Sequence, residues 1–149
     1  MKKLPFILFC FSLMSFIKWQ PDFLTARKVA HENHKLILLN FSGSDWCGPC
    51  MRMKNEIFES DVFSKMADTS LALVNADFPR NKKDRLNEQT EKQNDALADK
   101  YNPDGKCPLT LLLDADGNVL KSWDGFPKEN AEEFADEINS ICFDQKFNH

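Results

Sequence analysis

The chain has 149 residues, of which 42% are hydrophobic and 28% are charged, and its formal net charge is −4. This length and apolar content, with 13 phenylalanines, suffice for one domain around a single core, so we expect no second domain. An acidic chain of this kind is a poor binder of nucleic acid, because the phosphate backbone attracts basic surfaces.

The N-terminus has the pattern of an export signal. Lys2 and Lys3 precede an uncharged apolar run over residues 4–17, which Lys18 closes. This run is shorter than the roughly twenty residues of an ordinary membrane-spanning helix. We therefore expect a signal peptide over residues 1–20, a single domain over residues 21–149, and export to the periplasm or another part of the cell envelope.

No small-x-small pattern marks a cleavage site in this leader, and the cut can fall anywhere between about Ser15 and Gln20. The alternative to cleavage is a leader that anchors the protein in a membrane. Removal of residues 1–20 would take away three lysines and no acid, and would change the formal net charge from −4 to −7.

The spacing of apolar and turn residues predicts the elements that follow the leader. Their order, α-β-α-α-β-α-β-β-α, indicates a mixed sheet sandwiched by helices. Residues 114–118, with Gly117, form the turn of a β-hairpin. Helices are predicted over 21–35, from Cys47 through the amphipathic segment 51–58, over 62–67 (capped by Ser60), 86–101 and 131–142. Strands are predicted over 36–41, 71–74, 109–113 and 119–123.

Residues 78–106 are strongly polar and longer than a minimal α/β domain needs. The run Arg80-Asn81-Lys82-Lys83-Asp84-Arg85 is assigned to a solvated loop, because a charge run of this kind is more often a loop than a binding patch. The whole segment either shapes the choice of partner or is a solvated excursion.

The motif Trp46-Cys47-Gly48-Pro49-Cys50 lies where a buried strand ends and a helix begins. Cys47 would occupy the helix N-terminus, where unpaired N–H groups and the helix dipole stabilise a thiolate. Pro49 loses no hydrogen bond in the first turn, and Gly48 removes bulk beside Cys47. The pattern predicts an exposed Cys47 with Cys50 behind it, which is the layout of a thiol–disulfide exchange centre.

A C-x-x-C pair can also be half of a tetrahedral zinc site, which requires two further ligands at comparable spacing. Cys107 and Cys142 stand alone, and His31 and His34 lie on a predicted helix before the strand. We therefore predict no metal site.

Over roughly residues 21–142 the chain resembles the thioredoxin superfamily, and more closely its exported bacterial subgroup. The motif at 46–50 is identical to the reducing-type active-site sequence of the family. Cys107-Pro108, followed by an apolar strand, is similar to the strand that opens with a cis-proline opposite the active site. Gly117 and Gly125 are similar to the turn and groove-rim glycines. The resemblance implies an α/β thioredoxin fold with a central mixed four-stranded sheet flanked by helices.

The resemblance also implies a ping-pong exchange. Cys47 attacks a substrate disulfide and Cys50 resolves the mixed disulfide, which leaves Cys47 bonded to Cys50. A cis Pro108 would turn the backbone of Cys107 toward the dithiol for pairing with an extended substrate. Trp46 would shelter the pair, with Gly48 and Pro49 supporting the site, and no cofactor beyond this redox-active disulfide is expected.

The expected protein is thus an exported thiol–disulfide oxidoreductase, acting as a reductant of protein disulfides. It would receive electrons from a membrane or envelope thiol partner, act as a monomer and bind no nucleic acid. The alternative is a thioredoxin-fold adaptor or chaperone that holds partners in the groove beside Pro108 without turnover.

The chain departs from the family at three positions. Asn40 falls where thioredoxins carry the buried Asp that takes the proton of the resolving cysteine, and Leu73 falls where they carry its Lys partner. Both halves of a buried charge pair are thus replaced together. The hypothesis for the missing base is water, or Asp45 acting through water.

Cys107, the third departure, places a further sulfur directly before the proline. It is either a modulator of the redox pair or a small apolar residue, and the second interpretation carries more weight. Cys142 is interpreted as a small core residue of the last helix.

Overall fold

The computed structural model describes residues 17–147. Residues 1–16, which hold most of the predicted signal peptide, lie outside this range. No helix within residues 17–147 combines the length and the apolar character that crossing a bilayer requires.

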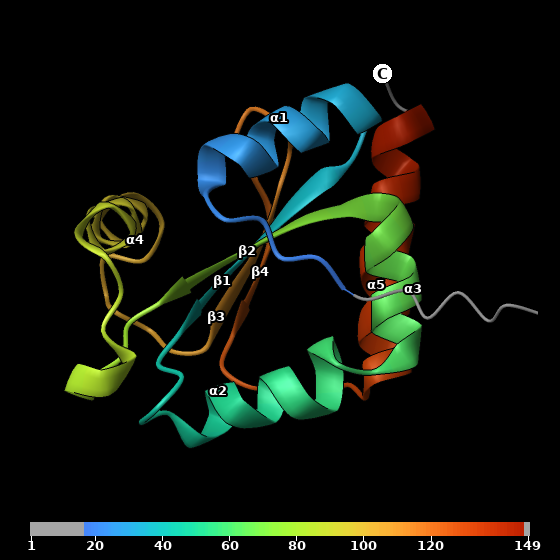
Figure 1. Cartoon of the computed structure of the whole chain (residues 1–149). Helices are drawn as coiled ribbons and strands as arrows, with labels where there is room; N and C mark the ends of the chain where they lie inside the picture. Colours follow the sequence, from blue (N-terminus) through green and yellow to red (C-terminus); the bar gives the residue numbers. More distant parts are fainter. Residues whose placement is uncertain (1–16, 148–149) are drawn as a thin grey trace, which may run out of the picture.

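A mixed four-stranded sheet forms the centre of the domain (Figure 1). β1 pairs in parallel with β2 and antiparallel with β3, and β3 pairs antiparallel with β4 as a hairpin. This arrangement confirms the predicted mixed sheet. In the spatial order of the sheet, the strands are β2 (Leu71–Asp77), β1 (Leu36–Ser42), β3 (Leu109–Leu113) and β4 (Val119–Asp124).

Helices cover both sides of the sheet. Two lie on one side, α1 and α4, and three on the other, α2, α3 and α5 (Figure 1). Their order along the chain is the predicted one, and α2 begins directly after Cys47 as expected, but from Met53 the helix widens into a π-helical segment, η1. The bounds are α1 (Phe23–Asn33), α2 (Gly48–Arg52), η1 (Met53–Phe58), α3 (Asp61–Ser70), the 3-10 turn η2 (Lys82–Asp84), α4 (Glu88–Tyr101) and α5 (Ala131–Phe147).

Side-chain caps set where several of these helices begin, α3 and α5 among them. Ser60 Oγ accepts a hydrogen bond from Phe63 N at 3.3 Å, which confirms the predicted cap of α3. At α5, Asn130 Oδ1 accepts from Glu133 N at 3.0 Å, while Asn130 N donates to Glu133 Oε2 at 3.1 Å. This reciprocal pair satisfies two backbone donors that a helix N-terminus leaves free.

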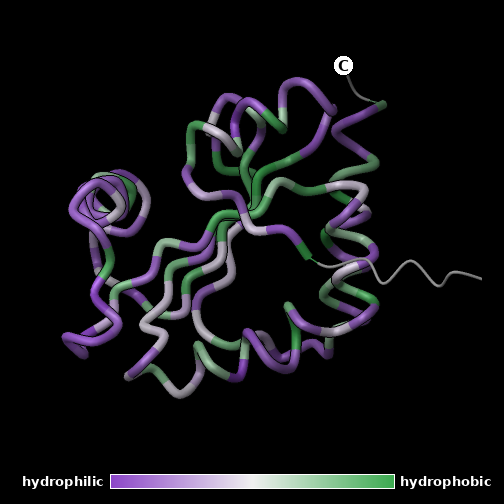
Figure 2. The backbone as a smooth tube through the Cα atoms, viewed as in Figure 1, coloured by the Kyte–Doolittle hydropathy of each residue, from purple (hydrophilic) through white to green (hydrophobic). Residues whose placement is uncertain are grey.

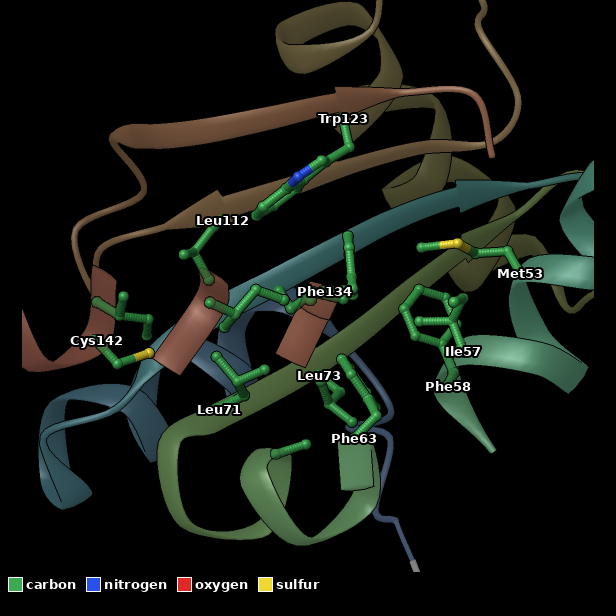
Figure 3. Packing of buried hydrophobic residues seen from close by; sticks show 14 residues of the cluster. Met53, Ile57, Phe58, Phe63, Leu71, Leu73, Leu112, Trp123, Phe134 and Cys142 are labelled. Carbon is green, nitrogen blue, oxygen red and sulfur yellow. The ribbon is translucent and has the colours of Figure 1, made fainter. Parts of the chain in front are cut away.

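β1, β2 and β3 each contribute to two cores, because successive side chains point to opposite faces of a sheet, whereas β4 contributes to one. Figure 2 shows hydrophobic residues gathered along the strands and polar ones over the helices. On the α1 and α4 side, the buried strand residues include Ile37, Leu39 and Val74. On the other side, shown in Figure 3, Leu38, Leu73, Leu112 and Trp123 of the strands pack with Met53, Ile57, Phe58, Phe63, Phe134, Ile138 and Cys142 of the helices.

The segment just before α1 covers the edge of β2. Trp19 forms an isolated parallel bridge with Leu73, and Gln20 N donates to Leu73 O at 2.7 Å. The Trp19 ring also packs edge-on against Phe58, with ring centroids 5.4 Å apart. Trp19 and Gln20, which the predicted boundary placed in the leader, therefore pack against the folded domain.

Candidate active site

The dithiol lies at the start of α2. Cys47 is the N-cap residue, and its Sγ accepts a hydrogen bond from Cys50 N at 3.2 Å. The two residues form a disulfide with their Cα atoms 5.2 Å apart. Pro49 lies in the first turn, where its missing N–H breaks no helical bond. Because η1 continues α2 without a break, the N–H groups of a longer helical segment point toward Cys47.

Both sulfurs are shielded in this disulfide state. Cys47 is 5% exposed and Cys50 is 4% exposed. The expectation of an exposed Cys47 is therefore wrong for the oxidised protein. The physical reason is that Cys47 Sγ is drawn back to Cys50 Sγ and to the Cys50 N–H, instead of pointing away from the helix.

Trp46 is held beside the dithiol by two neighbours. Its Nε1 donates to Phe78 O at 2.8 Å, and the Arg80 guanidinium lies 3.8 Å from the ring centroid. Gly43 closes the other side, since a Cβ at this position would overlap the indole. Trp46 is 37% exposed, so part of the ring is free to contact a partner.

Asp45 anchors a loop and does not face Cys50. Its carboxylate accepts hydrogen bonds from Arg80 N at 2.9 Å and 3.0 Å and from Asn81 N at 2.6 Å. These backbone donors hold the pKa of Asp45 below its ordinary value. A carboxylate with a lowered pKa is a weak base, so the geometry argues against Asp45 as the proton acceptor for Cys50.

The Cys107–Pro108 peptide bond is cis, at the end of the loop that precedes β3. Gly125 N donates to Pro108 O at 2.9 Å, and Gly125 has a φ of 84°, which a side chain would strain. On the other side of the loop, the buried Asn102 accepts from Lys106 N and donates to Lys106 O, both at 2.8 Å. These bonds set the position of the Cys107 backbone.

The two remaining cysteines of the described chain are unpaired thiols. Cys107 is partly buried, and its burial, together with the charge of Asp77, raises the pKa of the thiol, with partial offset by Arg80. Cys142 is a residue of α5 that points into the core, and burial raises the pKa of its thiol to about 11. The interpretation of Cys142 as a core residue is confirmed, whereas the role of Cys107 stays a prediction.

A cleft of about 670 Å³ opens beside Cys50. Its wall of aromatic and aliphatic side chains includes Trp19, Phe58 and Met51. Its polar lining includes Asn40, Ser42 and Asn75. Polar and apolar groups thus meet at Cys50.

Asn40 is bonded on both sides. Its Oδ1 accepts from Thr110 Oγ1 at 3.0 Å, and its Nδ2 donates to Asn75 Oδ1 at 2.8 Å. Ser42 Oγ donates to the same Asn75 oxygen at 3.2 Å. The neighbour of Asn40 is therefore Asn75 of β2, while Leu73 pairs with Leu38 in the apolar core.

The structure brings together most of the residues that the motif analysis singled out, Cys47, Cys50, Trp46, Gly48 and Pro49, at one end of the sheet. Sequence reasoning missed Asn75 and Gly43. Asn75 is a polar residue inside an otherwise apolar strand run, and this interruption was the available signal. Within residues 17–147, no group of three or more His, Cys, Asp or Glu side chains is placed to hold a metal ion.

Fold and site together define a thioredoxin-fold domain with a Cys-x-x-Cys disulfide at the start of α2. The chain belongs to the thioredoxin-like domain family, whose profile matches residues 23–141. This family membership confirms the resemblance inferred from the motif and the expected thioredoxin fold.

Two curated relatives come from Chlamydia pneumoniae. The chain is 33% identical over 104 residues to the disulfide bond reductase DsbH, a match that covers 70% of this chain and 60% of the relative. It is 29% identical over 126 residues to the thioredoxin-related protein DsbJ, covering 85% of this chain and 34% of the relative. The matches thus span less than two thirds of either relative.

Among solved structures, the domain is similar to the DsbH oxidoreductase. The TM-score is 0.77 at 28% identity, and the match covers 85% of each chain. The sheet and its flanking helices therefore have the same arrangement over most of both chains.

Proposed function

We propose that this protein is an exported thiol–disulfide oxidoreductase that reduces disulfides in other proteins. The observation that carries the proposal is the Cys47–Cys50 pair at the N-terminus of α2, in a domain whose similarity extends to a relative named as a disulfide bond reductase. The Gly-Pro dipeptide between the cysteines, as in the reducing thioredoxins, supports reduction as the direction. Export rests on the pattern of the leader.

In the first step, the reduced Cys47 attacks one sulfur of a substrate disulfide. A bond forms between Cys47 Sγ and that sulfur, the substrate S–S bond breaks, and the departing thiolate takes a proton from water. The Cys50 N–H, which lies 3.2 Å from Cys47 Sγ in the disulfide, would stabilise the attacking thiolate. An extended substrate would lie beside Trp46 and the Cys107 backbone.

In the second step, Cys50 loses its proton and attacks Cys47 Sγ. The mixed disulfide breaks, the second substrate thiolate leaves, and the Cys47–Cys50 disulfide seen here is formed. Asn40 cannot accept the proton, because both ends of its amide are engaged and an amide is not a base. Water entering the cleft beside Cys50 would carry the proton away.

The lining of the cleft also limits which carboxylate could accept the proton of Cys50. Among its lining residues, Glu59 is the one acid, and its Oε1 lies 3.8 Å from Lys54 Nζ at the rim. Direct release of the Cys50 proton to water is therefore the simplest route. A thiol partner in the envelope would then reduce the disulfide again.

The test is reduction of a disulfide-bonded protein substrate, with dithiothreitol as the electron source. Cys47→Ser should abolish the activity, and Cys50→Ser should accumulate a substrate mixed disulfide on Cys47 that mass spectrometry detects. Cys142→Ala is the matched control, because this thiol lies in the core and its loss should leave turnover intact. An intact protein without any reductase activity would instead favour the adaptor or chaperone alternative.

The direction of electron flow has its own measurement. Equilibration of the dithiol with thiol–disulfide buffers should give a potential near that of thioredoxin, about −270 mV. A potential near about −120 mV would contradict reduction and indicate an oxidant.

A further inference from the structure

The basic segment 80–85 lies beside the active site, although the sequence assigned it to a solvated loop. Asp45, two residues before Cys47, accepts the N–H groups of Arg80 and Asn81. Phe78 N also donates to Ser42 O at 2.9 Å, at the end of β1. Figure 1 shows the short turn η2 next to the loop that leads into α2. The segment is thus tied to the loop that carries the dithiol.

Most of the positive charge of this segment is available to a partner. Arg80, Lys82 and Lys83 are exposed, and none of the three forms a salt bridge within the part of the chain that the structure describes. Arg85 is paired with Glu91 at 3.1 Å, and Asp84 is the one acid of the run. The chain as a whole has a net charge of −4, so this local excess of positive charge is opposite in sign to the charge of the whole protein.

Arg80 links the basic segment to the dithiol. Its guanidinium lies 3.8 Å from the ring centroid of Trp46, the residue directly before Cys47 in the chain. The charge of Arg80 also acts on the thiol of Cys107, the residue before Pro108. It lowers the pKa of this thiol, whereas burial raises it. A substrate seated between Trp46 and Pro108 would therefore lie within the field of this cation.

We propose that Arg80, Lys82 and Lys83 form a docking surface for disulfide substrates that carry acidic residues next to the reactive cysteine. This inference rests on the proposed reductase function and adds a substrate class to it. Positive charge beside the dithiol raises the encounter rate with acidic segments and disfavours basic ones. The Asp45 contacts keep these charges at the site in the free protein, so little ordering is required on binding.

The experiment compares three disulfide peptides of identical length, whose cysteine is flanked by Asp, Asn or Lys. At low salt, kcat/KM should be about tenfold higher for the Asp peptide than for the Lys peptide, with the Asn peptide between them. At about 1 M salt, where the screening length is about 3 Å, the three values should converge.

Charge variants locate the effect. Lys82→Glu with Lys83→Glu should reverse the order of the Asp and Lys peptides, each compared with the Asn peptide in the same variant. The matched control is Lys28→Glu with Lys146→Glu, which makes the same change of net charge at two exposed lysines on α1 and α5, at the opposite end of the sheet from α2. It should keep the original preference.

The outcomes separate the two levels of the proposal. Equal kcat/KM values for the three peptides, or a preference that survives the double charge reversal, would overturn the docking surface while the reductase function stands. Failure to reduce even the Asn peptide would overturn the proposed function itself.

Discussion

Asn40 and Asn75 line the cleft beside Cys50. The prediction that Leu73 stands opposite Asn40 is wrong, because the register of β1 with β2 places Asn75 there and Leu73 in the apolar core. Asn40 Nδ2 donates to Asn75 Oδ1, and Asn40 Oδ1 accepts from Thr110, so the buried amide has partners on both sides. Two neutral amides avoid the desolvation penalty of a buried ion pair. The consequence is that Cys50 lacks a neighbouring base among the described residues that line the cleft, apart from Glu59 at the rim.

We predict that Asn40→Asp makes stability fall with rising pH. The new carboxyl would face Asn75 Oδ1 in a buried site, and both effects raise its folded pKa above the unfolded value of about 3.9. The variant therefore retains its stability at low pH and loses it as pH rises through the folded pKa. The loss should be about 1.4 kcal/mol for each pH unit between the unfolded and folded pKa values. Urea unfolding from about pH 4 to pH 9 measures this loss.

Asn40→Ala is the control for that series, because it removes the same hydrogen bonds without adding a titrating group. Its destabilisation should not vary with pH. An Asn40→Asp variant that follows the Asn40→Ala curve would contradict the prediction.

Three of the thiols of the reduced protein, those of Cys47, Cys107 and Cys142, should differ in reactivity. In the reduced protein at neutral pH, we expect iodoacetamide to modify Cys47 first, Cys107 more slowly and Cys142 last, because burial raises the pKa of the last two thiols, that of Cys142 to about 11. The Cys107 rate should rise with pH above the ordinary thiol range. Peptide mapping of timed samples gives the three rates, and equal rates for Cys47 and Cys107 would indicate that Cys107 is a reactive redox group.

At the scale of elements, the loop after β2 and the loop before α2 form one unit. Asp45 bonds two backbone N–H groups of the first loop, Trp46 bonds Phe78 O, and the buried Asn94 of α4 donates to Asp77 O at 2.9 Å. The polar segment after β2 is thereby held against the dithiol and also against α4. The extra residues of this segment thus hold Asp45 and Trp46 in place beside the dithiol.

We predict that Asp45→Asn leaves the pH–rate profile of disulfide reduction in place, because Asp45 acts as an anchor. The pKa of Asp45 is lowered by the backbone donors, so its stabilising effect exists above the unfolded pKa and disappears as pH falls through the folded pKa. The variant should therefore melt below the wild type at about pH 7, and the difference should vanish in acid. A shifted midpoint of the rate profile would restore Asp45 as a proton acceptor.

At the scale of the whole molecule, the sheet face under α2 changes from apolar to polar along its length. Leu38 pairs with Leu73 in the core, Asn40 with Asn75 beside the cleft, and Ser42 with Asp77 at the end. The Trp19 segment closes the β2 edge of this face and lines the same cleft. The apolar pairs of this face thus lie in the core at one end of the sheet, and the polar pairs lie at the other end, beside the dithiol.

We predict that a chain beginning at Pro21 is less stable than one beginning at Ile17. The shorter chain lacks the Gln20–Leu73 hydrogen bond and the packing of Trp19 on Phe58, which together should be worth about 1–3 kcal/mol. Urea unfolding compares the two chains. Trp19→Ala in the longer chain is the control, since it removes the ring and keeps the backbone bond, and equal stability of all three would contradict the prediction.

The sequence predicted the strands and helices well where their signals are local. The apolar run at 36–41, the cap at Ser60 and the periodicity of 131–142 depend on neighbours a few residues away. The widening of the active-site helix at Met53 and the bridge at Trp19 depend on packing against distant residues, and no local pattern indicated them. The same holds for the orientation of Asp45, whose partners lie 35 and 36 residues away.

By itself, the sequence located the candidate redox site, because a C-x-x-C pair at a strand–helix junction places two sulfurs at a helix N-terminus. The tertiary structure alone decided the surroundings: Asn75 next to Asn40, the cleft at Cys50 and the basic loop against Trp46. These contacts depend on the register of β1 with β2 and on the path of the chain after β2, which packs against Asp45 and Trp46. Register is set by the burial of whole strand faces, which is a property of the folded sheet.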